Sequence, residues 1–336
     1  MTGDKVRVIL VGAGRIALAH AEAVAACDAA VLVGVADLHP AAAAALGAQA
    51  GGVASATDSV ALAHETDAQL AIVCTPPATH EQLTISLLEA GVAVVCEKPF
   101  ALNVPSAAQM LQVSQRERVL CTMASKFRFV ADVTQARALI AAGTLGEPVL
   151  LQNVFSSPVT MSERWNADRD VAGGGVLIDN ATHSVDIVRY LFGPITEVLA
   201  TEASRVQPVM VEDTAKLLAR TARGALADID VSWSVDRRLE SFLWIQGTDA
   251  ELRIGWSASA MRRSGSDTWD PIGPGYQKVA AMSAQIEEVC SVLLGRGELR
   301  IDGEDALSSV QVLQAAYQSM STKSWQAVST RESVLQ

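Results

Sequence analysis

The sequence predicts an N-terminal α/β domain with a doubly wound parallel sheet, followed by a C-terminal α+β domain with an antiparallel sheet. At 336 residues the chain is too long for one ordinary compact core. In its first third, short apolar runs without alternation are separated by helical patterns, which is typical of parallel strands covered on both faces. Further along, several runs alternate apolar with polar residues, as strands with one solvated face do. We therefore expect one domain over residues 1–124 and a second over residues 125–336.

The strands of the first domain are predicted to end at turn-forming residues. Gly12 follows the first apolar run and Asp37 follows the second. Between the strands we expect a small-residue helix over 16–26, a helix that opens at Pro40, and a helix over 79–90. The predicted strands are Val6–Val11, Val31–Ala36, Leu70–Cys74, Val92–Cys96 and Val119–Met123.

The second domain is predicted to combine one central helix, over 176–192, with a set of alternating strands. From Lys278 the tail returns to helix, with Asp302-Gly-Glu-Asp305 capping one segment. The stretch Met261–Tyr276 is rich in Gly, Pro, Ser and Trp and predicts a long loop. The predicted helix and strands of this domain include 133–142, Val149–Phe155, Val198–Ser204, Ala215–Arg220, Ala225–Trp233 and Ser241–Gln246.

Composition and charge exclude several classes of protein. The net charge of -11 and the lack of any Lys/Arg run argue against nucleic-acid binding, which needs clustered basic residues. No apolar stretch approaches the length of a membrane span, and no basic segment followed by an apolar one opens the chain. The five cysteines are odd in number and form no C-x-x-C pair, which favours a reducing, cytoplasmic location. Histidines and cysteines show no usual metal-ligand spacing, so we expect no metal.

A glycine-rich turn between the first strand and the first helix predicts a dinucleotide site. Gly12-Ala-Gly14-Arg15-Ile16-Ala17 supplies glycines for a tight turn and for close approach of a pyrophosphate to the backbone. The helix that follows offers free N–H groups and a partial positive charge. Asp37, at the end of the next strand, suits a ribose 2′-hydroxyl and would repel a 2′-phosphate. The pattern favours NAD over NADP, although Leu38 and His39 also border that position.

Two further motifs carry candidate catalytic residues. Lys98 stands at the carboxyl end of a predicted strand, where doubly wound sheets bind ligands, and the following proline keeps it extended. By itself such a lysine is also compatible with a solvated turn. In the second motif, three glycines precede a predicted helix on which Asp179, His183 and Asp186 are spaced to share one face.

These motifs occur together in the order Gly12-Ala-Gly14-Arg-Ile-Ala17 with His20, Cys-Thr-Pro76-Pro77-Ala-Thr-His80, Glu97-Lys98-Pro99, and Gly-Gly-Gly-x-x-x-Asp179-x-x-x-His183-x-x-Asp186. In this combination the chain resembles the glucose–fructose oxidoreductase/inositol dehydrogenase/rhizopine-catabolism (Gfo/Idh/MocA) family. The resemblance spans nearly the whole chain, because the tail also matches. One departure is Ala181, where the family commonly has glycine.

The resemblance implies a Rossmann domain and a C-terminal domain with a large, mostly antiparallel open sheet, which often forms homodimer or homotetramer contacts. It also implies that Lys98, Asp179 and His183 are catalytic. The chemistry agrees, because alcohol oxidation needs a base that titrates near working pH, which is the property of His183. Asp179 would orient the imidazole or hold a neighbouring hydroxyl. Lys98 would donate to the reacting oxygen and stabilise its developing charge.

The remaining candidate residues are assigned to the two ligands. For His80, an ordinary helix-start role stays open beside cofactor contact. For Trp165, packing stays open beside stacking on a sugar face. The expected cofactor-binding residues are Gly12, Gly14, Arg15, Ile16, Asp37, Thr75, Pro76, Pro77, His80, Glu97 and Lys98. The expected substrate-binding residues are Lys98, Arg128, Trp165, Asp179, His183 and Tyr276.

We therefore expect an NAD(P)-dependent dehydrogenase that acts on a hydroxyl-bearing carbon of a cyclitol, sugar or sugar derivative. Ketone or imine reduction would use the same residues in reverse. An NAD-dependent glycosidase and a nucleotide-sugar dehydrogenase are alternatives on the same fold. A non-catalytic NAD(H) sensor is a further alternative, but it has no need of Lys98, Asp179 and His183 together.

Overall fold

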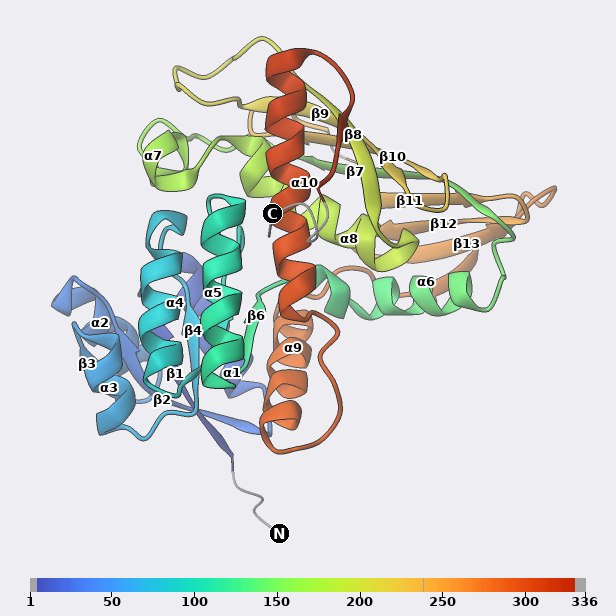
Figure 1. Cartoon of the computed structure of the whole chain (residues 1–336). Helices are drawn as coiled ribbons and strands as arrows, with labels where there is room; N and C mark the ends of the chain where they lie inside the picture. Colours follow the sequence, from blue (N-terminus) through green and yellow to red (C-terminus); the bar gives the residue numbers. More distant parts are fainter. Residues whose placement is uncertain (1–4, 238, 330–336) are drawn as a thin grey trace. The chain divides into compact units, whose positions relative to one another are not determined.

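The computed structural model describes residues 5–237 and 239–329, and the chain divides into two compact units. Unit 1 comprises the chain up to Lys126 together with Lys278–Leu307. Unit 2 comprises Phe127–Gln277 and the chain from Ser308 onward. Figure 1 labels most helices and strands of both units. In the described ranges, no helix is long and apolar enough to cross a membrane.

Unit 1 is built on a six-stranded parallel sheet in the order β3-β2-β1-β4-β5-β6. The sequence runs outward on both sides of β1 and β4, so the carboxyl ends of these two strands form the topological switch point. Strands β4 and β5 are buried along their whole length, which explains their unbroken apolar sequences. The strands are β1 (Val6–Val11), β2 (Ala30–Ala36), β3 (Ala54–Ala56), β4 (Leu70–Val73), β5 (Ala93–Cys96) and β6 (Cys121–Met123).

The helices of unit 1 cover this sheet, and two of them begin at capping side chains. Asp58 accepts hydrogen bonds from the N–H groups of Val60 and Ala61, and Asn103 accepts one from Ser106. Helix α9, from the distant tail, packs against α1 and adds apolar side chains to the same core. The helices are α1 (Arg15–Ala25), α2 (Pro40–Gln49), α3 (Ser59–Glu65), α4 (His80–Glu89), α5 (Val104–Glu117) and α9 (Lys278–Leu293).

Unit 2 is built on a nine-stranded sheet in the order β14-β13-β12-β11-β7-β10-β9-β8-β15. Neighbouring strands are antiparallel except β7 and β10, which run parallel. Burial alternates along β9 and β10, as expected when one face packs on a core and the other does not. The strands are β7 (Pro148–Ser156), β8 (Ile195–Glu202), β9 (Thr214–Thr221), β10 (Leu226–Ser232), β11 (Ser241–Gly247), β12 (Ala250–Gly255), β13 (Ser259–Arg263), β14 (Asp270–Gly273) and β15 (Gln326–Ala327).

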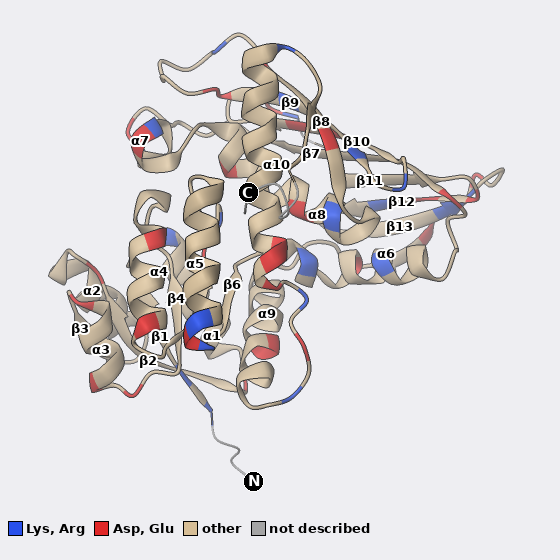
Figure 2. Ribbon diagram, viewed as in Figure 1, with Lys and Arg blue, Asp and Glu red and all other residues tan. Residues whose placement is uncertain are grey.

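Basic side chains on the strands of this sheet pair with acidic neighbours across the ladder. Lys216 of β9 lies 2.6 Å from Asp228 and 3.0 Å from Asp230, both on β10. Arg220 of β9 pairs with Glu197 of β8 in the same way. Figure 2 shows basic and acidic segments side by side on these strands rather than gathered by sign. Such pairs help to fix which strands are neighbours.

The helices of unit 2 are α6 (Ala131–Ala141), α7 (Arg169–Ala172) and α8 (Thr182–Phe192), and α10 (Gly303–Thr322) begins in unit 1 and ends in unit 2. The predicted cap at Asp302 is present, because its carboxylate accepts the N–H of Asp305. The predicted fold class is confirmed for both sheets. One local prediction is wrong, because the stretch 261–276 is not one long loop but contains most of β13 and all of β14. The predicted helix over 176–192 is present, and it opens with the π-helical turn η4 (Leu177–Ala181) before α8.

Candidate active site

The glycine-rich turn leaves the first turn of α1 open to a ligand. Gly12 has φ +99°, and a Cβ there would lie 3.0 Å from the carbonyl of Cys74, so both backbone shape and space require glycine. Gly14 is exposed, and a Cβ added to it would meet no other atom within 4 Å. No side chain caps the N-terminus of α1. Arg15 is exposed and Ile16 half-buried beside it. The residues present therefore fit a pyrophosphate bound at the helix N-terminus.

Asp37 fixes this turn as well as ending β2. One carboxylate oxygen accepts the N–H of Ala13 at 2.8 Å, and the other accepts the N–H of His39 at 2.8 Å. The backbone N–H of Asp37 in turn donates to the carbonyl of Ala56 on β3. The carboxylate therefore lies beside the glycine-rich turn. This agrees with its predicted role as the hydrogen-bond partner of a ribose 2′-hydroxyl of the cofactor.

Replacing Asp37 by alanine is expected to weaken NAD⁺ binding by about 10- to 100-fold, because a charge-assisted hydrogen bond is lost. Binding of NADP⁺ should weaken less, since the carboxylate repels a 2′-phosphate. Fluorescence titration with both nucleotides measures the two effects. Asp28→Ala, an exposed aspartate of unit 1, is the matched control. Unchanged NAD⁺ affinity in Asp37→Ala would remove the ribose assignment.

His80 links two turns of unit 1 through its imidazole ring. The side chain is completely buried, with Nδ1 2.9 Å from the carbonyl of Pro99 and Nε2 2.9 Å from the carbonyl of Thr75. Burial lowers the pKa of His80, and the hydrogen bonds to both carbonyls oppose this shift only in part. His80 therefore joins the turn after β4 to the turn after β5. Thr75 and Pro76 remain half-buried, whereas Pro77 is buried.

Glu97 and His20 form a buried pair directly behind Lys98. Nε2 of His20 lies 2.7 Å from Oε1 of Glu97, and the backbone N–H of Lys98 donates to Oε2 at 3.1 Å. Burial would raise the pKa of Glu97, but His20, Lys126 and Lys98 outweigh it and hold the pKa at about 2. The ionised carboxylate thus fixes the backbone from which the half-buried Lys98 side chain extends. Sequence reasoning did not assign a site role to His20.

This pair makes a testable contribution to stability. The pKa of Glu97 is about 2 in the folded chain against an ordinary 4.5, so the contribution is complete above pH 4.5 and is lost as the pH falls toward 2. Glu97→Gln is therefore expected to lower the free energy of unfolding at pH 7 by up to about 3 kcal/mol. In urea titrations the difference from wild type should shrink below pH 4.5. A constant difference across this range would contradict the ionised Glu97 carboxylate, and Glu65→Gln, at an exposed site, is the control.

In unit 2, Asp179 lies in the π-helical turn and His183 lies in the first turn of α8. Both side chains are half-buried. A π-turn inserted at the start of an α-helix is frequent at functional sites because it re-aims the side chains that it carries. Asp186 lies three residues after His183 in the same helix α8, but it is fully buried.

Arg128, a predicted substrate-binding residue, is buried in an ion pair. It is 3% exposed, and its guanidinium pairs with Asp186 through Nε at 2.8 Å and Nη2 at 2.6 Å. Its planar group also lies 5.4 Å from the centre of the Tyr190 ring. A buried ion pair of this kind holds the segment before α6 against α8, because exposing either charge alone to a dry interior is costly.

Five aromatic rings gather beside His183. The edge of the imidazole meets the ring of Phe127 with centroids 5.0 Å apart, and Phe155 lies 6.4 Å away. Tyr276 stacks on Phe127 at 5.1 Å, and Trp256 contacts Tyr276 at 5.7 Å. The fifth ring is Phe242, which packs between Phe155 and Trp256.

Most of this cluster was missed from the sequence, which pointed only to Tyr276. Trp256 is 42% exposed and forms its accessible side. Trp165, the tryptophan that was proposed to stack on a sugar, is 45% exposed on the short 3₁₀ helix η3 (Trp165–Ala167). It does not join the ring contacts around His183. Within the described ranges, no group of three or more His, Cys, Asp or Glu side chains is placed to hold a metal ion.

Comparison with known families agrees with the architecture. Residues 6–125 match an oxidoreductase family model with an NAD-binding Rossmann fold, and residues 133–253 match the Gfo/Idh/MocA C-terminal domain model. The chain belongs to the Gfo/Idh/MocA family and is an NAD-binding oxidoreductase. This confirms the family assigned from the sequence motifs.

The chain is similar to two named dehydrogenases and to a solved oxidoreductase structure over most of its length. It is 28% identical to inositol 2-dehydrogenase of Rhizobium meliloti (strain 1021), covering 95% of this chain and 98% of that protein. It is 23% identical to levoglucosan dehydrogenase of Pseudarthrobacter phenanthrenivorans, covering 74% and 72%. A crystal structure of an oxidoreductase from Agrobacterium radiobacter in complex with NAD⁺, L-tartaric acid and magnesium has a TM-score of 0.87 at 21% identity, covering 96% and 98%.

Proposed function

We propose that this protein oxidises a hydroxyl-bearing carbon of a cyclitol or a cyclic sugar, with NAD⁺ as hydride acceptor. The substrate class is supported by two features. Asp179 and His183 are both half-buried, and His183 contacts a cluster of aromatic rings. A sugar ring offers hydroxyls at its edge and C–H groups on its face, and polar groups next to aromatic faces match both. The printed names of the relatives, inositol 2-dehydrogenase and levoglucosan dehydrogenase, support the same class.

We assign the roles by chemistry. His183 takes the proton from the hydroxyl, because an imidazole titrates near working pH. Asp179 holds a neighbouring hydroxyl or orients His183. Lys98 donates to the reacting oxygen and stabilises the charge that develops there. Bound NAD⁺ supplies the hydride acceptor, and residues of unit 1 are proposed to hold it: Gly12, Gly14, Arg15, Ile16, Asp37, Thr75 and Pro76.

The proposal also covers the substrate contacts, the surface for self-association and the location. We propose that Tyr276 and Trp256 contact the substrate face, and that Glu97 and His80 act on the cofactor side only through the backbone that they hold. The open nine-stranded sheet is the proposed surface for a homodimer or homotetramer. All five cysteines are buried free thiols, which supports the cytoplasm as the location.

Initial rates of NAD⁺ and NADP⁺ reduction against cyclitols, aldoses and sugar acids, at mildly alkaline pH, test the proposal. We expect turnover with one stereochemical group of cyclic polyols and a preference for NAD⁺. Turnover only with a nucleotide-linked sugar or a glycoside would replace the substrate class. Tight NAD⁺ binding without turnover on any of these would favour a sensor.

A further inference from the structure

We infer that Glu212 is a positioning residue of the active site, and that with Tyr317 it fixes the turn that carries Asp179. The inference rests on the proposed function, since it takes Asp179 and His183 as the reactive pair. Neither Glu212 nor Tyr317 belongs to the motifs from which the site was predicted. Both lie in unit 2, on the same side of the chain division as the turn that they hold.

Glu212 accepts hydrogen bonds from three successive backbone N–H groups at the start of that turn. Its carboxylate oxygen Oε1 accepts from Gly175 at 3.0 Å and from Leu177 at 3.1 Å, while its own carbonyl accepts from Val176 at 2.8 Å. The first N–H groups of a helix have no partner within the helix. One acidic residue therefore satisfies three of them, and its negative charge suits the positive end of the helix dipole.

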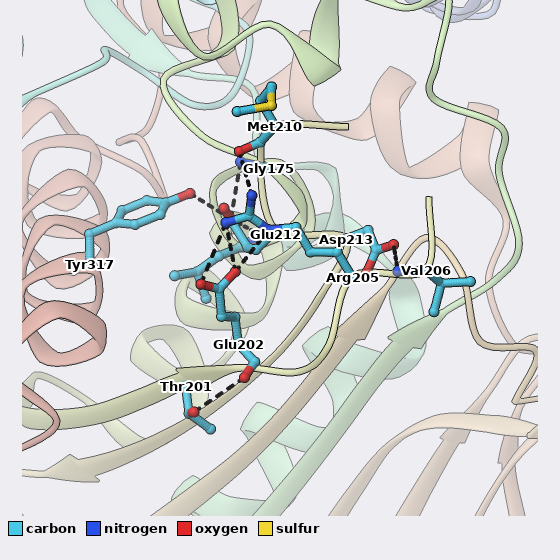
Figure 3. Close-up of polar contacts among 10 residues, drawn as sticks. Gly175, Thr201, Glu202, Arg205, Val206, Met210, Glu212, Asp213 and Tyr317 are labelled. Carbon is cyan, nitrogen blue, oxygen red and sulfur yellow. Dashed lines mark hydrogen bonds and ion pairs between the residues drawn. The ribbon is translucent and has the colours of Figure 1, made fainter. Parts of the chain in front are cut away.

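Tyr317 of α10 completes the arrangement. Its hydroxyl donates to the same Oε1 of Glu212 at 2.8 Å, and Figure 3 shows it pointing at the carboxylate from the side of α10. Burial, and next the charge of Glu212, raise the pKa of Tyr317 well above its ordinary value. The hydroxyl therefore stays protonated and remains a donor throughout the working range of pH.

The triple glycine is explained by these two residues. A Cβ on Gly174 would collide with the Tyr317 hydroxyl, and a Cβ on Gly175 would collide with the Glu212 carbonyl. Neither glycine has a positive φ, so the requirement is for space and not for backbone shape. The space that two of the three glycines leave is thus occupied by the protein itself.

Glu212 is itself held in place by the hydrogen bonds of its neighbour Asp213. The next residue, Asp213, is fully buried, and its Oδ2 accepts from the N–H groups of Val206 and Gln207 at 2.7 Å each and from the Ser234 hydroxyl at 2.8 Å. Figure 3 shows Glu212 and Asp213 side by side. Glu212 is 5% exposed, so water competes little for its acceptor atoms.

A single hydrogen bond connects Asp179 to the backbone that Glu212 holds. The N–H of Asp179 donates to the carbonyl of Gly175 at 3.1 Å, and Gly175 is the residue that Oε1 holds. We call Glu212 and Tyr317 the clamp, because together they hold the backbone of residues 175–177. A shift of residues 175–177 must therefore move the backbone of Asp179. Because a misplacement of about 1 Å can lower a rate about 100-fold, the geometry predicts an effect on kcat from a residue that touches no substrate.

Three substitutions test this in the full-length protein. Glu212→Ala is expected to lower kcat about 100-fold with the NAD⁺ dissociation constant unchanged, since the nucleotide residues lie in unit 1. Glu212→Gln keeps an oxygen acceptor at the same position and is expected to restore most of kcat. Tyr317→Phe removes one neutral hydrogen bond and should lower kcat about 5-fold. Tyr190→Phe, at a buried tyrosine of α8, is the control for loss of a tyrosine hydroxyl elsewhere in unit 2.

Full kcat in Glu212→Ala, or an equal loss in Glu212→Gln, would overturn the positioning role. A second test compares free energies of unfolding, so it does not need the variants to be active. Gly174→Ala should be severely destabilised alone, but should add little further loss when Tyr317 is also alanine, because the collision is then absent. Independent effects of the two substitutions would contradict the clamp.

Hydrogen–deuterium exchange separates failure of this inference from failure of the proposed function. If the wild type turns over no polyol, the catalytic proposal fails, but faster exchange of residues 175–179 in Glu212→Ala than in wild type would still establish the clamp. Unchanged exchange of this segment in Glu212→Ala would reject the clamp whatever the activity.

Discussion

Lys98→Ala is expected to lower kcat about 1000-fold while leaving the NAD⁺ dissociation constant unchanged. Lys98 is the proposed donor to the reacting oxygen, and loss of one such preorganised donor costs about 100- to 1000-fold in rate. Its side chain is half-buried, and its backbone is fixed by the ionised carboxylate of Glu97. Steady-state kinetics and fluorescence titration measure the two quantities.

The control for Lys98→Ala is Lys278→Ala, which removes an exposed lysine at the start of α9 in the same unit. Its kcat should match wild type. Lys98→Arg keeps the charge but replaces a compact ammonium by a planar group, and should recover only part of the rate. A near-normal rate in Lys98→Ala would end the role assigned to this lysine.

His183→Gln is expected to lower kcat/KM by about 100- to 10,000-fold, the range that a positioned general base contributes. Because the proton must then pass to solvent, the residual rate should continue to rise with pH where the wild-type rate levels off. Glutamine retains polar character next to Phe127, which limits the loss of packing against the ring cluster. Rates measured across the pH range for both proteins check the prediction.

His64→Gln, at an exposed histidine of α3, is the matched control and should leave the pH profile unchanged. If His183→Gln retained both the rate and the shape of the wild-type profile, the base would have to be another group. A loss of rate with an unchanged profile would point to Asp179 or to a water molecule as the proton acceptor.

The first sheet could be predicted well because its central strands are buried on both faces. Unbroken apolar sequences such as those of β4 and β5 have few other structural explanations. Strand β3 was missed because it is an edge strand of three residues with a small, partly exposed sequence. Strands β13 and β14 were mistaken for a loop because Arg, Asp, Pro and Gly dominate them and conceal any alternation.

The sequence predicted which residue types the candidate site contains better than it predicted their burial and contacts. Asp37 and Lys98 follow strand ends, which is a local signal. The burial of His80 and Arg128 could not be predicted, because it depends on distant carbonyls and on Asp186. The ring cluster could not be predicted, since Phe242 on β11 and Phe155 on β7 meet only through the order of strands in the sheet. The π-turn has no sequence signal that distinguishes it from the α-helix that it opens.

The chain runs from unit 1 into unit 2, returns to unit 1 and ends in unit 2. This path limits how its domains can be exchanged with those of relatives. Unit 1 is completed only by Lys278–Leu307, whose residues Met282, Ile286 and Val289 belong to the same core as β1 and α1. A fragment cut after Lys126 would expose that core. Helix α10 then continues without a break from one unit into the other. Exchange of nucleotide modules between relatives therefore requires two crossover points and a fused helix, so cofactor preference is more readily changed by point substitution at Asp37 than by grafting.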